Sequence, residues 1–252
     1  MVSAGLTERE REIVRRLAED ANISVSRLSE QLGVSAVTVR SDLGNLAQKG
    51  VIVRTRGGAT PAFHPSVIVR QNLRSEEKNR IAQAAAALVD DGDTIMIEAG
   101  TTTALIAQYL LGKRFVNIVT NSTLIVPFAR INPGLHLTMV GGEFHPATES
   151  LVGPMALGEL ERFHVRLAFV GTDGFSLEGG LTTHLVDGAE IVRKMAERSD
   201  ETVLVADSSK YGRIGFVHVL PATRVVRLVT DTGLSAEADA ALREAGIAVT
   251  RV

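Results

Sequence analysis

The sequence of 252 residues contains no cysteine and no tryptophan, and aromatic residues make up only 4% of it. The absence of cysteine excludes disulfide bonds, thiolate zinc sites and cysteine nucleophiles, and it fits a reducing compartment. Because aromatic side chains are scarce, a hydrophobic core has to be built from valine, leucine, isoleucine and alanine.

The chain also lacks a long apolar run. No stretch approaches the roughly 20 residues that a membrane-spanning helix needs, and the first nine residues are too polar for a secretory signal. We therefore expect a cytoplasmic protein, and its length fits two domains.

Motifs that mark enzymes and metal sites are missing as well. The six histidines show no metal-ligand spacing. The sequence has neither a phosphate-binding loop of the Walker A type nor a G-x-S-x-G nucleophile motif. We predict no catalytic residue, no metal and no cofactor.

The net charge of −2 argues weakly against a nucleic-acid partner, but the distribution of charge is uneven. Residues 1–60 carry nine basic and seven acidic side chains, whereas the rest of the chain is net acidic. This sign places a phosphate-binding face near the N-terminus. Because so small an excess binds DNA weakly in a monomer, we expect a homo-oligomer, a dimer or a tetramer, that multiplies the contacts.

Residues 1–60 show the pattern of three short helices. Thr7 and Glu10 form a capping box that predicts a helix over residues 8–20. Ser24 is placed to begin a second helix that Gly33 ends, and Ser35 begins a third that extends toward Gly50. Short helices joined by tight turns are typical of a helix-turn-helix.

The third helix has the two faces that a DNA-reading helix needs. Val39, Leu43 and Leu46 share its inner face. The apolar residues 51–53 and the glycines at 57–58 predict a wing hairpin after it. The predicted DNA-binding residues are Ser35, Thr38, Arg40, Ser41, Arg54 and Arg56. The pattern alone leaves open a small three-helix domain that binds protein.

Residues 76–252 alternate short apolar strands with helices, after a linker at 61–75. Strands that are apolar throughout are typical of a mainly parallel sheet covered on both faces. The predicted fold is therefore α/β, with an N-terminal winged helix-turn-helix domain at 1–60 and a C-terminal mainly parallel domain at 76–252.

Gly100 follows a predicted strand at 94–97, and three threonines after it open a predicted helix at 101–111. A glycine turn that leads into a helix N-terminus favours an anion such as a phosphate. An ordinary helix cap is the alternative.

Polar clusters follow four further strands, and in an open α/β sheet ligands bind outside the carboxyl ends of the strands. Asp173, Asp207 and Glu143 are candidates to bind sugar hydroxyls, and Lys210 to pair with a phosphate. Residues 179–183 suit a lid over the site or a hairpin loop. The candidate effector-binding residues are Gly100, Thr101, Thr102, Thr103, Thr120, Asn121, Ser122, Gly142, Glu143, Asp173, Gly174, Thr182, Thr183, Asp207 and Lys210.

The stretch from Ile23 to Thr60 closely resembles the helix-turn-helix of the DeoR family of bacterial sugar-responsive transcriptional regulators. The matching pieces are LSEQLGVS at 28–35, TVRSDL at 38–43 and RTRGGA at 54–59. The family often has a second arginine where this chain has Ser41, which removes one potential phosphate or base contact.

The segments EAGTTTALIAQYL, VTNS, GGEF, GTDGF and VADSSKYG, which begin at residues 98, 119, 141, 171 and 205, resemble the sensor domain of the same family. That sensor is similar in fold to ribose-5-phosphate isomerase. The resemblance implies a repressor of a carbohydrate-utilisation operon that binds double-stranded operator DNA and a phosphorylated sugar effector. Glu98 and Ala99 stand where many members have aspartate and serine.

The alternative is a sugar-phosphate isomerase-like enzyme with an appended DNA-binding domain. Asp173, Glu143 and Lys210 are of the types that acid–base catalysis requires. Binding without turnover is the simpler interpretation of a chain that also carries a DNA-reading domain, so we expect a regulator and not an enzyme.

Overall fold

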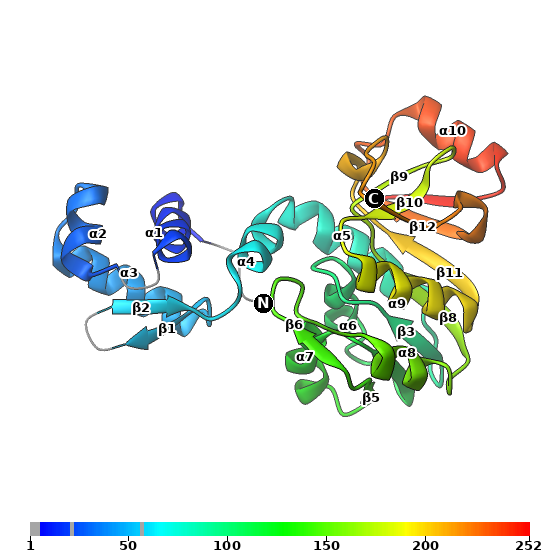
Figure 1. Ribbon diagram of the computed structural model, residues 1–252, viewed down its shortest axis with the longest axis horizontal. Coiled ribbons are helices and arrows are strands. Elements are labelled where there is room, and N and C mark those ends of the chain that lie inside the picture. The colour runs from blue at the N-terminus through cyan, green and yellow to red at the C-terminus, as the bar shows by residue number, and fades with distance from the viewer. Residues whose placement is uncertain (1–5, 21–22, 56–57) are drawn as a thin grey trace. The chain divides into compact units, whose positions relative to one another are not determined.

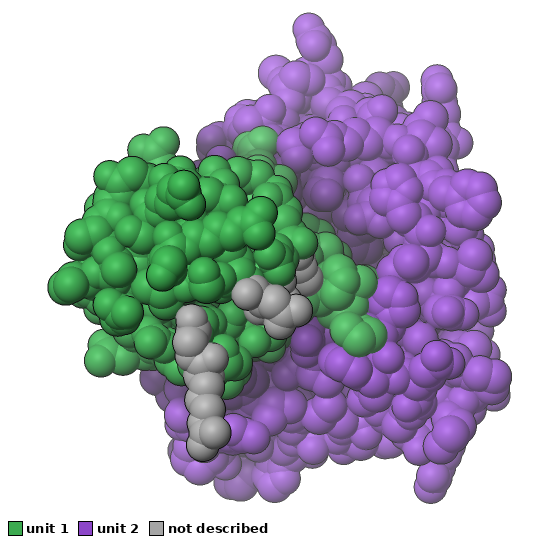
Figure 2. All heavy atoms as spheres, turned by 60° about the vertical axis from the view of Figure 1, so that its left-hand side comes forward, with its two compact units in different colours: residues 1–75, 146–148 green, residues 76–145, 149–252 purple. Residues whose placement is uncertain are grey.

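The structure is a computed structural model that describes residues 6–20, 23–55 and 58–252. The chain divides into two compact units (Figure 2). The N-terminal unit comprises residues 1–75 together with 146–148, and the C-terminal unit comprises residues 76–145 and 149–252. The stretch expected as a linker, 61–75, clusters with the N-terminal unit.

The N-terminal unit begins with three helices, α1 (Glu8–Glu19), α2 (Val25–Leu32) and α3 (Ala36–Gln48). The predicted capping box is present: the Glu10 amide donates to Thr7 Oγ1 over 3.1 Å, and the Thr7 amide donates to Glu10 Oε2 over 2.7 Å. Ser24 and Ser35 cap α2 and α3. The sequence therefore located all three helix starts, because each depends on a local side-chain cap.

A shared core joins the three helices, with Ile13, Leu17, Leu28, Leu43 and Leu46 all fully buried. Two ion pairs connect α1 to the third helix and its cap, Arg9 with Asp42 at 2.6 Å and Glu10 with Lys49 at 2.9 Å. The partner carboxylates are almost completely buried, which fixes α1 against α3.

A two-stranded antiparallel wing follows, formed by β1 (Ile52–Thr55) and β2 (Gly58–Pro61). Arg56 and Gly57, in its predicted turn, lie outside the described residues. A further helix, α4 (Pro65–Asn72), occupies much of the stretch expected as a linker.

A seven-stranded sheet forms the centre of the C-terminal unit, and all its neighbouring strands pair in parallel (Figure 1). Ile95, Met96 and Ile97 are consecutive and all fully buried, so both faces of the sheet are covered. The prediction of a parallel α/β sheet is confirmed. In order across the sheet, the strands are β14 (Ala248–Arg251), β13 (Arg227–Thr230), β11 (Ser199–Val205), β8 (Val165–Val170), β3 (Thr94–Ile97), β4 (Val116–Thr120) and β5 (Leu135–Met139).

Helices pack against this sheet. On one face, Met96 and Ala168 pack with Ala156 and Ile191, which belong to two of the helices. In chain order the helical elements are α5 (Ser75–Ala86), η1 (Thr103–Leu105), α6 (Ile106–Tyr109), η2 (Thr123–Ile125), α7 (Val126–Ile131), α8 (Pro154–Leu160), α9 (Val186–Glu197), η3 (Ser208–Lys210), η4 (Ala222–Arg224) and α10 (Ala236–Glu244). In the described part of the chain, none is both long and apolar enough to cross a membrane.

The predicted helix at 101–111 is wrong in its first part, which is a turn followed by the 3₁₀ segment η1 and the four-residue α6. The cause is local, because Thr103 Oγ1 donates to the carbonyls of Glu98 and Gly100 and so holds residues 100–102 outside a helix. The helix-dipole argument for an anion at this turn therefore does not apply.

The sequence also missed a set of short antiparallel strands. A hairpin joins β6 (Glu143–His145) to β7 (Ser150–Val152), and a three-stranded sheet has the order β12 (Val217–Leu220), β10 (Gly180–Thr183), β9 (Gly174–Ser176). Strands of three or four residues are too short to show a period in the sequence. Residues 179–183, predicted as a lid or a hairpin loop, instead contribute a strand: residues 180–183 form β10, in which Leu181 and Thr182 pair with strands on both sides.

One ion pair ties the start of β3 to β8. Arg166 Nε donates to Asp93 Oδ1 over 2.8 Å, a second Arg166 nitrogen donates to Asp93 Oδ2, and the same guanidinium donates to the carbonyl of Leu88. The hydrogen bond from Arg166 lowers the pKa of the Asp93 carboxyl below its ordinary value.

We expect Asp93→Asn to lower the free energy of unfolding by about 1–3 kcal/mol near neutral pH, the usual range for hydrogen bonds to charged groups. Because the folded pKa is depressed, this stabilisation is present above the unfolded pKa of about 3.9 and is lost as the pH falls through the lower folded pKa. Urea unfolding of both proteins over a pH series measures the difference, which should shrink in acid. A difference independent of pH would contradict the assignment.

Candidate functional site

The exposed face of α3 carries the predicted DNA-reading residues. Val39, Leu43 and Leu46 are fully buried, which turns Arg40 and Ser41 outward. The hydroxyls of Ser35 and Thr38 lie 2.9 Å apart, and Ser35 Oγ accepts from the Thr38 amide over 3.1 Å. These two hydroxyls therefore hold the start of the helix, whereas Arg40 and Ser41 are exposed.

The wing contributes a second cation beside α3. Arg54 Nη1 donates to the carbonyl of Arg40 over 3.3 Å, so the first wing strand lies against the middle of α3. Arg56, the other predicted wing contact, lies outside the described residues. The arrangement gives the N-terminal unit a basic, exposed surface of the kind that contacts DNA phosphates.

In the C-terminal unit, the polar clusters that follow β3, β4, β5, β8 and β11 share one edge of the sheet, because the strands are parallel. The strand order reverses between β3 and β8, since the chain proceeds from β3 through β4 to β5 and then returns to β8 on the other side. Such a reversal opens a crevice between neighbouring loops, and ligands of open α/β sheets bind there.

The loop after β3 is held by Thr103, which is fully buried and donates to the carbonyls of Glu98 and Gly100 over 2.7 and 3.1 Å. Thr101 and Thr102 are only half-buried. Within the described residues, the amides of Thr101 and Thr102 donate no hydrogen bond. This loop therefore offers backbone donors and hydroxyls, and Thr103 itself stabilises its conformation.

Lys78 on α5 is a member of this site that sequence reasoning missed. Its side chain is nearly fully buried, with 6% exposure, and Nζ donates to Thr101 Oγ1 over 3.2 Å. A signal was present, because Lys78 shares the spacing of the buried residues Ile81, Ala82 and Ala85 on the inner face of its helix. A lysine in such a stripe indicates a buried cation with a polar partner.

Glu98 connects the two loops at the strand-order reversal. Its Oε2 accepts from the Gly171 amide over 3.1 Å, which joins the loop after β3 to the loop after β8. The longer acid, at the position where the resemblance implies aspartate, thus lies within the candidate site.

The cluster after β4 is hydrogen-bonded to the loop after β3 and to β7. Asn121 Oδ1 accepts from the Ala99 amide over 2.9 Å, and its Nδ2 donates to the carbonyl of Leu151 in β7 over 3.2 Å. Thr120 donates to the carbonyl of Ile97 over 2.5 Å. Ser122 is fully buried, and its Oγ has no hydrogen-bond partner among the described residues. Asn121 therefore holds the loop after β3 in place, and Thr120 holds the end of β3 itself.

The loop after β8 is organised by β10. Asp173 Oδ2 accepts from Thr183 Oγ1 over 2.9 Å and from the His184 amide over 3.0 Å. Thr182 is buried, donates to the carbonyl of Gly174 over 2.9 Å and accepts from the Gly215 amide over 2.7 Å. Asp173 and Thr183 are half-buried, so they are the members of this cluster that solvent reaches.

The loop after β11 packs against the same antiparallel sheet. The rings of Phe175 and Tyr211 meet edge to face at 5.4 Å, and a Cβ added at Gly174 would lie 2.3 Å from the carbonyl oxygen of Arg213. Asp207 is buried and accepts from the amide and hydroxyl of Ser209. Lys210 is half-buried, and its ammonium makes no hydrogen bond or ion pair within the described residues.

The hairpin of β6 and β7 carries the last two candidates. Gly142 has φ +136°, and a Cβ there would lie 2.5 Å from the carbonyl oxygen of Val152, so only glycine fits. Glu143 is exposed on β6, and within the described chain no hydrogen bond connects its carboxylate to the other candidates. Contacts among the described residues thus connect the loops after β3, β4, β8 and β11, either directly or through β10. Glu143 takes no part in these contacts.

The described residues include no cluster of three or more metal-ligating side chains. What the edge of the sheet does present is two lysines, accessible hydroxyls and backbone amides, together with carboxylates that accept hydrogen bonds. Cations and amides bind phosphate oxygens, and carboxylates bind hydroxyls.

Both parts of the chain match known families. Residues 9–62 match the DeoR-like helix-turn-helix domain, and residues 73–232 match the DeoR C terminal sensor domain.

Relatives with known names align over nearly the whole chain. A protein of Escherichia coli O157:H7 with the provisional name aga operon transcriptional repressor is 33% identical, over 98% of this chain and 94% of its own. The transcriptional regulator GlpR of Haloferax volcanii is 35% identical over 96% of both chains. The transcriptional repressor GlcR of Bacillus subtilis is 31% identical over 85% of this chain and 84% of its own.

Solved structures of similar fold include the full-length sorbitol operon regulator SorC from Klebsiella pneumoniae, with a TM-score of 0.42, 13% identity, and coverage of 94% of this chain and 100% of its own. Ribose 5-phosphate isomerase A from Methanocaldococcus jannaschii has a TM-score of 0.39 and 20% identity over 54% of each chain. The strand order of the seven-stranded sheet, and not these similarities, defines the fold of the C-terminal unit.

We expect Thr103→Val to lower the free energy of unfolding by about 1–2 kcal/mol, because the buried hydroxyl proton that the Glu98 and Gly100 carbonyls share is lost. Thr102→Val is the matched control, since Thr102 is half-buried and its hydroxyl makes no hydrogen bond in the described structure; its expected change is below about 0.5 kcal/mol. Urea unfolding measures both, and equal effects would contradict a structural role specific to Thr103.

Proposed function

The chain belongs to the DeoR family of helix-turn-helix transcriptional regulators, and we propose that a small phosphorylated sugar controls its binding to operator DNA. The observation that carries the proposal is the pair of lysines at the carboxyl edge of the sheet. Lys78 contacts the loop after β3, and Lys210 follows β11.

A phosphate monoester fits the loop after β3. The buried ammonium of Lys78 supplies charge, and the amides and hydroxyls of Thr101 and Thr102 supply directed donors. Lys210 is a second cation at the same edge, with a flexible stem that suits a point-charge contact. Gly100 permits this turn, since a Cβ there would lie 2.8 Å from Thr103 Oγ1.

The sugar hydroxyls would bind to carboxylates near the strand-order reversal. Asp173 and Glu98 accept hydrogen bonds from amides or hydroxyls of the protein, and each carboxylate has further acceptor capacity. Asp207, Thr103, Thr120 and Thr182 are placed to hold the loops rather than to touch the ligand. Of the effector-binding residues predicted from the sequence, we therefore propose that only those accessible to solvent contact the ligand.

In the DNA complex, α3 would enter the major groove with Arg40 and Ser41 at base edges or phosphates, and Arg54 would contact the backbone. We propose that the protein represses a carbohydrate-utilisation operon in the cytoplasm, and that a dimer or tetramer binds repeated half-sites. The GlcR and aga operon names describe relatives that act as repressors.

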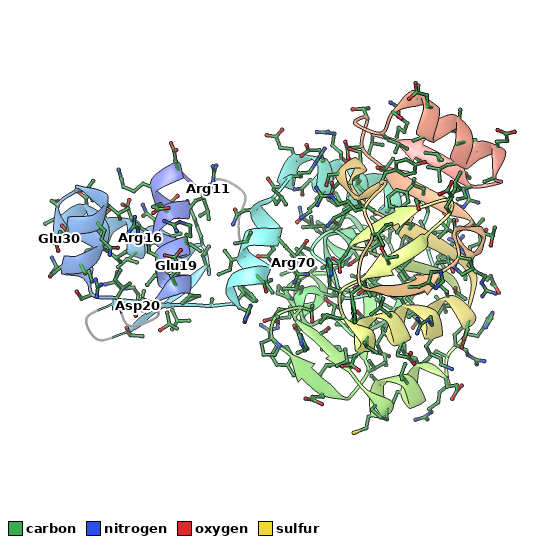
Figure 3. All side chains as sticks on the ribbon, turned by 45° about the horizontal axis from the view of Figure 1, so that its top comes forward. Arg11, Arg16, Glu19, Asp20, Glu30 and Arg70 are labelled. Carbon is green, nitrogen blue, oxygen red and sulfur yellow. The ribbon has the colours of Figure 1, made fainter. Side chains whose placement is uncertain are left out.

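A hairpin offers a route from the effector to the operator. Asn121 binds the loop after β3 and also Leu151 of β7, whose amide donates to the Asn121 carbonyl over 2.8 Å. The tip of that hairpin, residues 146–148, clusters with the N-terminal unit. There the carbonyl of Ala147 accepts from Ser66 Oγ over 3.0 Å and from Arg70 Nη2 over 2.6 Å, both on α4 (Figure 3).

To regulate, the effector must bind one arrangement of the protein more tightly than another. A coupling of about 1–3 kcal/mol changes operator affinity roughly 5- to 150-fold. We propose that the effector releases the operator by shifting the β6–β7 hairpin and α4.

The first experiment is a thermal-shift screen of the full-length protein against sugar phosphates and their unphosphorylated parents. A ligand that binds only the folded protein raises the melting temperature by mass action. A phosphorylated sugar that stabilises the protein when its parent does not supports the proposal, and the absence of any such compound opposes it. Conversion of a sugar phosphate to product would support the enzyme alternative instead.

Arg40→Ala and Lys210→Ala are expected to separate the two binding functions. Arg40→Ala should weaken operator binding by about 1–3 kcal/mol and leave effector affinity intact, because its side chain lies only on the DNA-reading face. Lys210→Ala should weaken effector binding and leave operator affinity intact. Operator titrations and ligand-dependent melting measure both, and equal losses of both functions in either variant would contradict the separation.

We expect Arg70→Ala to reduce the coupling while it preserves both affinities. The variant loses one of the two hydrogen bonds that α4 side chains donate to the Ala147 carbonyl, so saturating effector should change operator affinity at least fivefold less than in the wild type, within the usual range of coupling. Val69→Ala is the control, since Val69 is 60% exposed on the same helix. A wild-type response in Arg70→Ala would exclude this route.

A further inference from the structure

An apolar side chain is exposed in the first turn of α3. Val37, in the first turn of the helix, is 73% exposed although the buried residues of α3 are Val39, Asp42, Leu43 and Leu46. Val37 shares its face with Ser41 and Gly44, at spacings of four and seven residues, and this face is opposite the buried one. Within the described residues of this unit, the Val37 side chain is therefore largely open to solvent.

The neighbouring hydroxyls are already engaged. Ser35 and Thr38 bond to each other and cap the helix, as described above. Among the first two turns of α3, the side chains left to face a ligand are therefore Val37, Arg40 and Ser41. The Val37 side chain has no group that binds phosphate, and an apolar group is the kind of partner against which it can be buried.

Gly44 keeps the same face open. A Cβ at Gly44 would meet no atom within 4 Å, so nothing within the described structure requires a glycine there. Glycine in a helix interior costs about 1 kcal/mol relative to alanine. Its absence of a side chain lets the backbone of α3 approach another surface closely, one turn beyond Ser41.

The apolar group that a major groove presents is the C5-methyl of thymine, and the N-terminal residues of a recognition helix are the ones that reach base edges. We propose that Val37 is a specificity-determining residue that contacts a thymine methyl in each operator half-site. The inference rests on the proposed placement of α3 in the major groove. Arg40, three residues further along the helix, would then lie over an adjacent base pair or phosphate.

The test uses a duplex selected by the full-length protein from a randomised pool. Each thymine of that duplex is replaced in turn by uracil, which removes the methyl group and leaves base pairing unchanged. We expect one position in each half-site at which the replacement weakens wild-type binding about fourfold, the effect of losing one buried methyl-sized group. Val37→Ala should bind the thymine duplex correspondingly less tightly and lose its sensitivity at that position alone.

Val53→Ala is the matched control, because Val53 is 58% exposed on the wing strand β1 of the same unit. It should retain the wild-type response to uracil at every position. Since both valines are exposed, neither change should alter the melting temperature, and this is checked first.

The outcomes separate this proposal from the one on which it rests. If Arg40→Ala lowers affinity for the selected duplex but no uracil replacement affects the wild type, Val37 does not read a thymine methyl. Full sensitivity retained in Val37→Ala leads to the same conclusion. If Arg40→Ala binds as the wild type does, or if no duplex is selected, α3 is not the reading helix and both proposals fail.

Discussion

Every strand of the central sheet runs in the same direction, and this constraint brings the candidate effector site together. Parallel strands deliver the residues that follow them to one edge, so residues as far apart in the chain as Thr101 and Lys210 lie along it, and Lys78 of α5 reaches the same edge through its hydrogen bond to Thr101. The reversal of strand order between β3 and β8 then parts two adjacent loops, and the bond between Glu98 and the Gly171 amide spans them.

The polar residues at this edge divide into two groups by their burial. Thr103, Thr120 and Asp207 are buried and satisfy backbone groups, as buried polar side chains must. Thr102, Asp173 and Lys210 are accessible and have donors, acceptors or charge to offer a ligand. The buried residues hold the loops of the candidate site in place, and the accessible residues are the ones available to a ligand. Residue type alone does not distinguish the two groups, because each contains threonine and aspartate.

In the N-terminal unit too, some polar side chains hold the helices together and others are exposed. The hydroxyls of Ser35 and Thr38 begin α3, and the ion pairs of Arg9 with Asp42 and of Glu10 with Lys49 hold α1 to α3 and its cap. This leaves the outer face of α3 exposed, with Val37, Arg40 and Ser41 in its first two turns. In the proposed regulation, the hydrogen bonds of α4 to the Ala147 carbonyl are the point at which a change in the β6–β7 hairpin would reach the DNA-binding unit.

By itself the sequence determined the features that depend on neighbours in the chain. These are the three capped helices, the wing, the parallel sheet with its buried strands, and the membership of the DeoR family. Only the tertiary structure decided which polar residues face a ligand, because burial and long-range hydrogen bonds are set by elements far apart in sequence. It placed Lys78 of α5 beside Thr101, turned the predicted helix at 101 into a 3₁₀ turn through Thr103, and left Val37 uncovered. The contact of Lys78 and the exposure of Val37 depend on what packs, or does not pack, against each residue, whereas the turn at 101 depends on hydrogen bonds of Thr103 to neighbours in the chain that helix patterns do not reveal.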